Sequence, residues 1–381
     1  MVELIEEHRG YLADAARLDA YTRALSALVA PGDVVVDLAA GTGVLGMLAC
    51  RAGASRVYAI EEGPIAGLAR RIVKANGFED RVVIVRAHSS EAILPERGDV
   101  LVADQLGPFG IDAGVIDVFR DARARLLRPG AALVPSTLEL VTAPVVHPRT
   151  HERISFWAKK PAGLDMTATF DTALNAMHVV RIRSAQLLGA PAVLLGIDLG
   201  LEPADELQGS CSHRITRPGM LHGIGGWFVA TLAPSVILTN SPTSAERIRR
   251  RQVIFPLREA IPVDAGDVVD ATFRFRPSDD VYAWDVTVSA GSGRPRRFRH
   301  STFAGLVLER GDLRRTAPSY RPCLSQRGAA RLTVLQLCRG GAAVGEIEAE
   351  VYERHGTLFA SRAQADRFVA EIVSRDARAS S

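Results

Sequence analysis

The sequence contains very little lysine. Of its 46 basic residues only three are lysines, Lys74, Lys159 and Lys160. We interpret this bias as the composition of a GC-rich bacterial genome rather than as a requirement of the fold. The excess of basic over acidic residues is also small, 46 against 43, which gives a formal net charge of +3. Because this excess is spread along the chain, it gives no electrostatic reason to expect a nucleic-acid partner.

Cysteine and long apolar runs are scarce as well. The four cysteines are far apart and form neither a CxxC pair nor the spacing of a metal site. No apolar run approaches the 18 residues of a membrane-spanning helix. The N-terminal stretch MVELIEEHRG is charged and acidic, unlike a signal peptide. We therefore expect a reduced, cytoplasmic protein with no membrane partner.

The first third of the chain alternates between predicted strands and helices. Residues 1–30 have apolar residues at helical spacing, and a Pro-Gly pair ends the pattern. From residue 34 onward, short runs that are apolar on both faces alternate with helical segments, as far as a helix predicted over 115–127. Strands without a polar face are typical of a buried parallel sheet. The alternation therefore predicts a doubly wound α/β domain.

After Pro135 the pattern changes. Residues 136–325 contain many short β-rich segments separated by turn residues, which predicts an antiparallel sandwich or barrel. Within this region residues 165–188 are predicted to be helical, and residues 332–373 are helical again before a polar tail. A chain of 381 residues has room for two domains or three small ones.

A glycine-rich turn, Ala39-Ala40-Gly41-Thr42-Gly43, follows the first predicted strand. Glycines there allow a ligand to approach the backbone, and the following helix presents free N–H groups. Glu61 ends the second strand, where a carboxylate can bind both hydroxyls of a ribose. Because Gly46 completes a GxGxxG spacing, NAD is not excluded, but Asp37 would repel a pyrophosphate. An acid at this place suits a ligand with an amine and a sulfonium.

These residues resemble class I S-adenosylmethionine-dependent methyltransferases, and in particular the protein arginine methyltransferases. VVVDLAAGTGVLGMLACRAGASRVYAIE is similar to the first two motifs of that family, and HRGYLADAARLDAY is similar to its N-terminal helix. The resemblance covers about residues 5–290. It implies a Rossmann-like fold followed by a β-barrel, with the following parts: a helical cofactor lid (1–30), a cofactor-binding domain (31–135) and a barrel (136–325) with an inserted dimerisation arm at about 163–186.

The resemblance also implies the cofactor, S-adenosyl-L-methionine, and its contacts. In the family the arginine of the N-terminal helix, here Arg17, pairs with the methionine carboxylate. Ala39 stands where the family usually has the first glycine of the loop, and we expect binding to survive this change because alanine is small. The expected cofactor-binding residues are His8, Arg17, Asp37, Ala39, Gly41, Gly43, Glu61, Ser90 and Glu91.

The substrate residues depart from the family pattern. Arginine methyltransferases hold a guanidinium between two glutamates, because paired carboxylates match its planar donors. Here Asp104 stands at the first glutamate position, and Ala113 at the second, beside Asp112. The supporting Thr-His-Trp segment becomes Ile248-Arg249-Arg250. The predicted catalytic residues are Asp104, Gln105 and Tyr11, and the predicted substrate-binding residues are Asp112, Arg249 and Arg250.

Three functional hypotheses follow. The first is a bacterial methyltransferase acting on an acceptor other than arginine, an amine such as the terminal amine of a ribosomally made natural-product peptide. Methyl transfer needs mainly positioning, so we expect Asp104 to orient this amine rather than to act as a base. The second is a divergent protein arginine methyltransferase in which Asp104 and Asp112 suffice. The third is a non-catalytic partner protein that keeps the cofactor pocket for stability.

Residues 326–381 lie outside the arginine methyltransferase pattern. They are similar to winged-helix domains of modified-peptide pathways, which bind a leader peptide as an added strand. The alternative is a small helical unit that only packs on the barrel. The family also forms dimers through its barrel arm, so we expect a homodimer.

Overall fold

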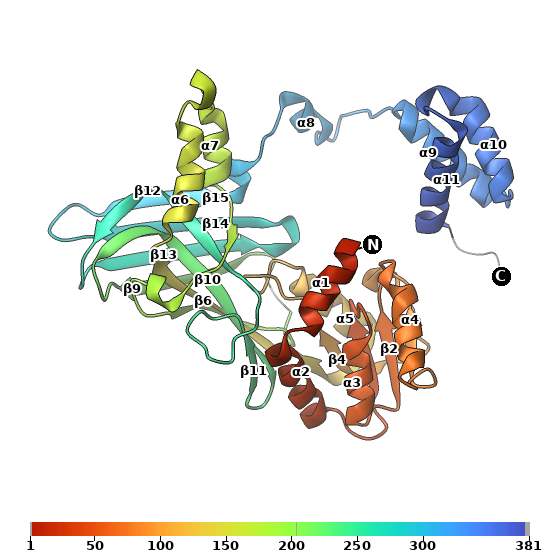
Figure 1. Ribbon diagram of the computed structural model, residues 1–381, viewed down its shortest axis with the longest axis horizontal. Coiled ribbons are helices and arrows are strands. Elements are labelled where there is room, and N and C mark those ends of the chain that lie inside the picture. Colours follow the sequence, from red (N-terminus) through yellow and green to blue (C-terminus); the bar gives the residue numbers. More distant parts are fainter. Residues whose placement is uncertain (1, 203, 378–381) are drawn as a thin grey trace. The chain divides into compact units, whose positions relative to one another are not determined.

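The computed structural model describes residues 2–202 and 204–377. It divides the chain between Leu306 and Val307 into two compact units (Figure 1). Among the described residues, no helix is both long and apolar enough to cross a membrane.

The N-terminal part of the first unit is a parallel sheet with helices on both faces. Its order is β3-β2-β1-β4-β5, so the chain reverses direction across the sheet between β1 and β4. Every neighbouring pair is parallel. The elements are α1 (Val2–Leu12), α2 (Ala15–Leu28), β1 (Val34–Leu38), α3 (Val44–Ala52), β2 (Arg56–Ile60), α4 (Ile65–Ala75), β3 (Val82–Val85), β4 (Gly98–Ala103), α5 (Val115–Arg125) and β5 (Leu127–Val134). All residues of β1 are buried, as a strand covered on both faces requires.

The second part of this unit consists of two antiparallel sheets. The larger has the order β7-β12-β10-β6-β8 with β11 paired to β10, and the smaller has the order β15-β14-β13-β9. The strands are β6 (Thr137–Val145), β7 (His178–Val180), β8 (Ala192–Asp198), β9 (Leu207–Arg214), β10 (Gly219–Ala233), β11 (Val236–Thr239), β12 (Gln252–Val263), β13 (Val268–Arg276), β14 (Val281–Ser289) and β15 (Arg296–Ser301). In β14 buried and half-buried residues alternate, as expected for a strand with one face on the core.

One hydrophobic core joins both parts of the first unit. Phe109, from the loop after β4, is fully buried, and its ring packs against Phe255 at 5.2 Å and against Phe275 at 5.7 Å between centroids. Trp284 lies 5.4 Å from the same Phe255 ring, and its indole N–H donates to the carbonyl of Pro256. The loop that carries Asp104 is therefore held by the aromatic core of the barrel.

The α/β domain and the antiparallel region are as predicted, but several boundaries differ. The predicted helix over 1–30 is two helices, because Asp14 has extended backbone angles that end one and begin the next. Residues 127–134 form β5, a strand that was not predicted, because Arg128-Pro129-Gly130 follows the helix predicted over 115–127 and is typical of the end of a helix. Residues 165–188 contain one α-helix, α7 (Thr167–Leu174), after which β7 joins the sheet and Ser184–Gln186 form a short 3-10 helix. Together with α6 (Pro148–Ser155), α7 projects from the barrel (Figure 1), so the projecting segment begins before residue 163.

The second unit has its own small core. Its helices are α8 (Arg310–Arg315), α9 (Gln326–Arg339), α10 (Val344–His355) and α11 (Arg362–Asp376). Three valines form its centre and are completely buried: Val334 of α9, Val351 of α10 and Val369 of α11. Within residues 307–377 no strand is present. The unit therefore offers no sheet edge for the strand addition that the winged-helix resemblance implies.

Candidate active site

The candidate site lies at the carboxyl ends of β1, β2 and β4. These strand ends carry Asp37, Glu61 and Asp104 in turn, and β1 lies between the other two strands. Because the sheet order reverses between β1 and β4, a crevice opens at this edge, which is where α/β sheets bind ligands. The sequence alternation alone therefore brings three acidic residues to one place.

The glycine turn after β1 lies against the lid helix α1. Gly41 and Gly43 both have positive φ angles, 55° and 77°, and a Cβ on Gly41 would lie 2.7 Å from Cε1 of His8. Gly41 thus has a left-handed conformation that glycine adopts without a steric cost, and its missing side chain leaves room for the histidine ring. Ala39 also has a positive φ, 52°, which costs an alanine about 1–2 kcal/mol. The loop keeps the left-handed conformation in spite of this substitution.

Glu61 connects the second strand to the glycine turn. Its carboxylate accepts hydrogen bonds from the backbone N–H of Gly41 at 2.9 Å and of Gly63 at 2.7 Å. The side chain also lines the cavity that contains the glycine turn. Glu61 is thus held in one orientation, with further lone pairs on both oxygens for a ligand's hydroxyl groups.

Asp37 is completely buried behind the glycine turn. Its Oδ2 accepts a hydrogen bond from the N–H of Gly46 at 2.8 Å, whereas Oδ1 has no partner among the described residues. Burial raises the pKa of Asp37 to about 7, and the Gly46 hydrogen bond and Arg17 offset only part of this effect. Asp37 does not itself line the described cavities. It supports the loop from behind, and with a pKa of about 7 it is only partly ionised at neutral pH.

Asp104 forms a buried ion cluster with two arginines. Nε of Arg17 lies 2.5 Å from its Oδ2, and the guanidinium of Arg250 lies 3.2 Å from the same carboxylate. The exposed fractions of the three side chains are only 8%, 9% and 13% for Arg17, Asp104 and Arg250. One carboxylate between two guanidinium groups leaves the cluster with a net charge of +1. In a water-poor site this charge acts strongly on any charged acceptor.

Two tyrosines surround the Arg17 guanidinium. It lies 5.5 Å from the ring centroid of Tyr11 and 5.4 Å from that of Tyr21, within the range of cation–π attraction. Burial raises the pKa of Tyr11, and the Glu7 carboxylate, which accepts its hydroxyl at 3.0 Å, adds to the effect. The Tyr11 hydroxyl therefore stays protonated near neutral pH and donates hydrogen bonds.

Asp112 forms a hydrogen bond within the loop to which it belongs. Its Oδ1 accepts the N–H of Phe109 at 2.9 Å, and its carboxylate occupies the space where Gly107 would carry a side chain. Burial raises its pKa, in part offset by this hydrogen bond. Asp112 thus closes the turn after Asp104 while lining the neighbouring cavity. Ala113, at the second glutamate position, lines the same cavity and supplies no carboxylate.

Asn240 holds the same loop from the barrel side, a role that sequence analysis missed. The side chain is completely buried. Its amide N–H₂ donates to the carbonyls of Pro108 and Arg251, both at 2.7 Å, and its oxygen accepts the N–H of Phe228. Asn240 therefore fixes the loop of Asp104 relative to the segment of Arg250. No local pattern indicates such a residue, because its partners are 132 and 11 positions away.

Asp14 joins the lid to the barrel. Its carboxylate accepts the backbone N–H of Arg249 at 2.6 Å, across 235 positions of the chain. Asp14 is also the residue at which α1 and α2 meet. The position of the lid is therefore coupled to the segment that carries Arg249 and Arg250.

The predicted site residues separate into two groups. One cavity, of about 320 Å³, brings together the predicted residues His8, Tyr11, Arg17, Ala39, Gly41, Glu61, Asp104, Gln105 and Arg250. A neighbouring cavity of about 590 Å³ adds Asp112 and Arg249 and shares Tyr11, Arg17 and Arg250. Gly43 belongs to the turn but lines neither cavity. Ser90 and Glu91 also line neither cavity. The residues just before them, His88 and Ser89, line a third cavity at the same edge of the sheet.

The first cavity fits a ligand with an amino-acid end and a ribose. Nη1 of Arg17 is buried and has no hydrogen-bond partner in the described chain, so it is available to a carboxylate. Glu61 is oriented for hydroxyl groups, and the N-terminus of α3 (Val44–Ala52) follows the glycine turn. The donors and acceptors present therefore match S-adenosylmethionine.

Comparisons with known proteins show the family of the chain. A family model described as "Arginine methyltransferase oligomerization subdomain" matches residues 139–289, and one described as "Ribosomal protein L11 methyltransferase (PrmA)" matches residues 21–146. The chain is 30% identical over 291 residues to protein arginine N-methyltransferase 6 of Xenopus tropicalis, covering 72% of this chain and 85% of the relative. This chain belongs to the protein arginine N-methyltransferase family.

The solved structures of the family share the fold. A Trypanosoma brucei PRMT1 enzyme–prozyme complex with AdoHcy superimposes with a TM-score of 0.68 over 77% of this chain and 97% of the other, at 22% identity. Protein arginine methyltransferase 10 of Arabidopsis thaliana gives 0.66 with the same coverage and identity. The predicted fold class, a Rossmann-like domain followed by a barrel-like domain, is confirmed. The protein is an S-adenosylmethionine-dependent methyltransferase.

The buried Asp37 predicts a pH dependence of stability. Its pKa is raised from 3.8 to about 7 in the folded protein, so between these values the folded state holds a proton that the unfolded chain has released. The free energy of unfolding should therefore fall as the pH rises from about 4 to about 7, by at most on the order of 4 kcal/mol. Asp37→Asn should remove this part of the decline, and the exposed Asp80→Asn should not. Denaturant unfolding at pH 5 and pH 7.5 measures both; identical pH slopes for Asp37→Asn and wild type would contradict the assignment.

Glu61 should determine cofactor affinity. Loss of its carboxylate removes charge-assisted hydrogen bonds, each contributing about 1.5–3 kcal/mol, so Glu61→Ala should weaken S-adenosylmethionine binding at least about tenfold. Glu61→Gln, which keeps an acceptor, should lose less. Isothermal titration calorimetry measures the affinity, with the exposed Glu79→Ala as the matched control. Unchanged affinity in Glu61→Ala would mean that the cofactor binds elsewhere.

Proposed function

We propose that this methyltransferase transfers its methyl group to an acceptor other than arginine, namely an amine such as the terminal amine of a peptide. The observation that carries this proposal is the buried cluster of Asp104 with Arg17 and Arg250. A guanidinium acceptor at this place would meet a net positive charge instead of two carboxylates. It would lose its hydration without gaining the bidentate partners that compensate for burial.

The side chains favour a neutral nucleophile or one that brings its own carboxylate. Ala113 removes the second carboxylate, and Asp112 already accepts a hydrogen bond from its own loop. Arg250 remains as a donor that faces both cavities. An acceptor carrying a carboxylate would therefore find a partner here, whereas an acceptor carrying only positive charge would not.

The residues of this chain act by positioning. The cofactor, when bound, supplies an electrophilic methyl group on a sulfonium. Arg17 holds the carboxylate end of the ligand, Glu61 its hydroxyl groups, and the lid residues His8 and Tyr11 cover the cavity and exclude water. We assign to Asp104 and Gln105 the orientation of the acceptor by hydrogen bonds. Such alignment supplies about 7–11 kcal/mol of the barrier in well-oriented reactions.

The second candidate function is arginine N-methylation. The names of the relatives favour it over a different acceptor: 30% identity links the chain to a protein arginine N-methyltransferase over most of both lengths. In that case Arg250 would have to leave Asp104 when the substrate enters. The two candidates therefore differ in one observable, the nucleophile that receives the methyl group.

Methyl transfer from isotopically labelled S-adenosylmethionine to two acceptor pools decides between them. One pool contains N-acetylated arginine-rich peptides, and the other contains peptides with free terminal amines but no arginine. We expect label in the second pool only, located by tandem mass spectrometry. Asp104→Asn should lower the rate at least about tenfold, because the buried guanidinium groups of Arg17 and Arg250 lose their carboxylate partner. Label on arginine side chains would establish the second candidate and overturn our proposal.

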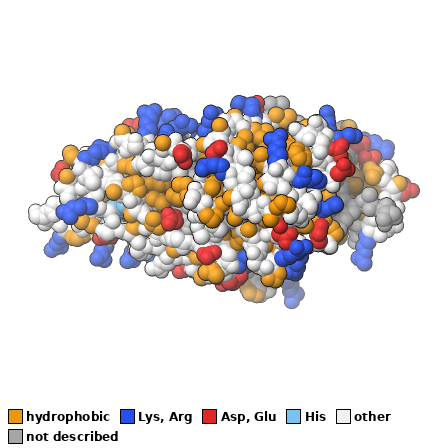
Figure 2. Space-filling model, turned by 90° about the horizontal axis from the view of Figure 1, so that it is seen from below, with side chains coloured by type: hydrophobic (Ala, Val, Ile, Leu, Met, Phe, Trp, Pro, Cys, Tyr) orange, Lys and Arg blue, Asp and Glu red, His pale blue; other side chains and the backbone are white. Residues whose placement is uncertain are grey.

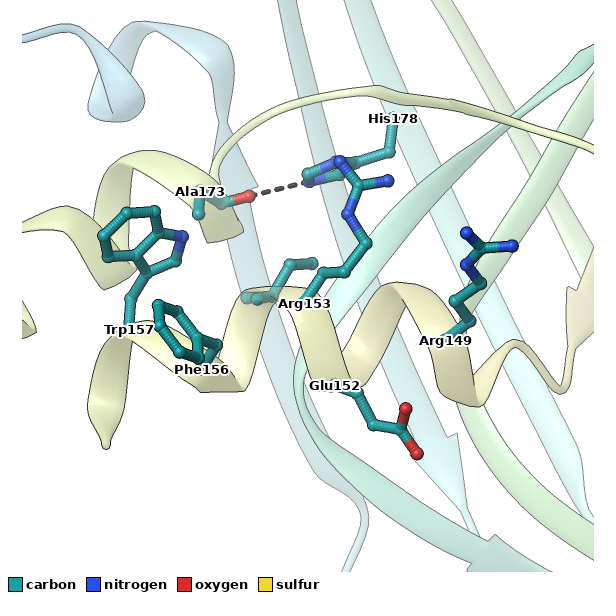
Figure 3. Close-up of a pocket in the computed structure, with 8 residues that line it drawn as sticks. Arg149, Glu152, Arg153, Phe156, Trp157, Ala173 and His178 are labelled. Carbon is teal, nitrogen blue, oxygen red and sulfur yellow. Dashed lines mark hydrogen bonds between the residues drawn. The ribbon is translucent and has the colours of Figure 1, made fainter. Parts of the chain in front are cut away.

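We also propose that the protein forms a homodimer through α6 and α7. This pair of helices projects from the barrel, and residues 139–289, which include it, match the oligomerization subdomain of the family. At its tip the rings of Phe156 and Trp157 pack edge to face at 5.3 Å, and Phe156 is 45% exposed. Figure 3 shows both rings beside a cavity of about 420 Å³ that also contains Arg153 and His178. A partly exposed aromatic pair on a projecting element is typical of an interface anchor.

Light scattering coupled to size-exclusion chromatography tests this assembly. The chain mass is 40.9 kDa, so a dimer should give twice that value. Phe156→Ala combined with Trp157→Ala should shift the protein toward the monomer without changing its circular dichroism, because both side chains reach solvent. A monomeric wild-type protein at micromolar concentration would contradict the proposal.

A further inference from the structure

A groove lined by arginines lies next to the candidate active site. Its walls come from residues 181–184 and residues 242–252, and its volume is about 780 Å³. Six of the residues that line it are arginines and none is acidic: Arg181, Arg183, Arg247, Arg249, Arg250 and Arg251. We call this feature the arginine groove.

Five of these arginines have no acidic partner. Arg250 pairs with Asp104, but within residues 2–202 and 204–377 no carboxylate lies within 4.0 Å of the other five guanidinium groups in an ion pair. These five are also exposed. Other exposed arginines of the same region do have acidic partners, as Arg258 has in Asp171 and Arg274 in Asp285. The groove therefore concentrates unneutralised positive charge.

The walls of the arginine groove are fixed by buried hydrogen bonds. Gln252 is buried, and its Oε1 accepts the N–H of Ile182 at 2.8 Å while its Nε2 donates to the carbonyl of Asn240 at 2.6 Å. Arg181 and Arg183 alternate with the buried Ile182 along an extended segment, so both face outward. The groove is thus a preformed surface, and binding there does not require the walls to be ordered first.

The arginine groove is continuous with the methyl-transfer site. Ile248, Arg249 and Arg250 line both the groove and the cavity next to Asp104, and Arg250 also lines the cofactor cavity. A ligand that occupies the groove therefore reaches Arg250, which contacts Asp104 on its other side. A peptide acceptor whose nucleophile lies at the methyl-transfer site could therefore place residues some positions further along its chain in the groove.

The chemistry of the groove favours an acidic peptide over a nucleic acid. Its lining contains no aromatic side chain on which bases could stack. On the face shown in Figure 2, basic side chains lie among acidic and apolar ones, and the net charge of the chain is only +3. Beside the groove β7 is the outer strand of its sheet, an edge to which extended peptides can add.

We propose that the arginine groove binds an acidic segment of the peptide acceptor and thereby selects which peptides reach the methyl-transfer site. This inference rests on the proposed function, methyl transfer to a non-arginine acceptor. It adds that the acceptor peptide carries an acidic segment near its nucleophile. Glutamate and aspartate side chains of an extended peptide would pair with Arg181 and Arg183 on one wall and with Arg247 and Arg251 on the other.

Fluorescence anisotropy tests the groove without any methyl transfer. The probes are a fluorescein-labelled peptide of alternating glutamate and glycine, a matched lysine–glycine peptide, and a single-stranded oligothymidylate. The wild-type protein should bind the glutamate peptide in preference to both others, with an affinity that falls as salt is added. Arg183→Gln combined with Arg251→Gln should weaken this binding about tenfold, as expected for the loss of two charge pairs.

The control is the double variant Arg294→Gln with Arg297→Gln, which removes the same charge from exposed positions outside the groove and should bind within about twofold of wild type. Equal weakening in both double variants, or tighter binding of the lysine peptide, would overturn the proposal. Tighter binding of oligothymidylate would also overturn it in favour of a nucleic acid. The binding experiment contains no cofactor, so its outcome is independent of the label-transfer assay. Label on arginine in that assay would refute the proposed non-arginine acceptor. Equal binding of the glutamate and lysine peptides in this experiment would refute the proposed role of the arginine groove.

Discussion

The ion cluster of Asp104 with Arg17 and Arg250 is the interaction on which the rest of the site depends. It joins α2, the loop after β4 and the segment before β12 at one carboxylate. Buried charges are tolerated only when they are paired and hydrogen-bonded, so each of the three side chains constrains the other two. Asp14 and Asn240 then fix the backbones that carry them. A site built in this way keeps its shape and its net positive charge before any ligand enters.

Much of the fold followed from local patterns. Strands that are apolar on both faces predict a parallel sheet, and the glycine turn with Glu61 indicates the ligand-binding edge, because these signals lie within about 25 consecutive residues of one another. The resemblance of the first two motifs to arginine methyltransferases gave the family correctly. The interruption at Asp14 was missed because the residues on both sides are helical, and β5 was missed because its Arg-Pro-Gly sequence reads as the end of a helix.

The chemistry of the substrate pocket could be predicted only in part. Aligning the loop after β4 showed that the second carboxylate is absent and that arginines replace the histidine segment, but spacing does not tell which arginine meets Asp104. That contact joins residues 146 positions apart. The roles of Asn240 and Gln252 also depend on partners brought together by the barrel, so no local signal marks them. The arginine groove has the same origin, since its two walls are separated by about 60 residues of the chain.

A crystal structure of the protein with S-adenosylhomocysteine tests the central claim most directly. S-adenosylhomocysteine has a carboxylate that can form hydrogen bonds with part of the Arg17 guanidinium. Arg250 is then the partner of Asp104 whose position determines the charge of the acceptor site. We predict that Arg250 remains within ion-pair distance of Asp104 in this complex and that the cavity beside Ala113 stays free of a second carboxylate. An Arg250 side chain turned away to solvent, with Asp104 and Asp112 both facing an open cavity, would contradict this account and restore a pocket suited to guanidinium.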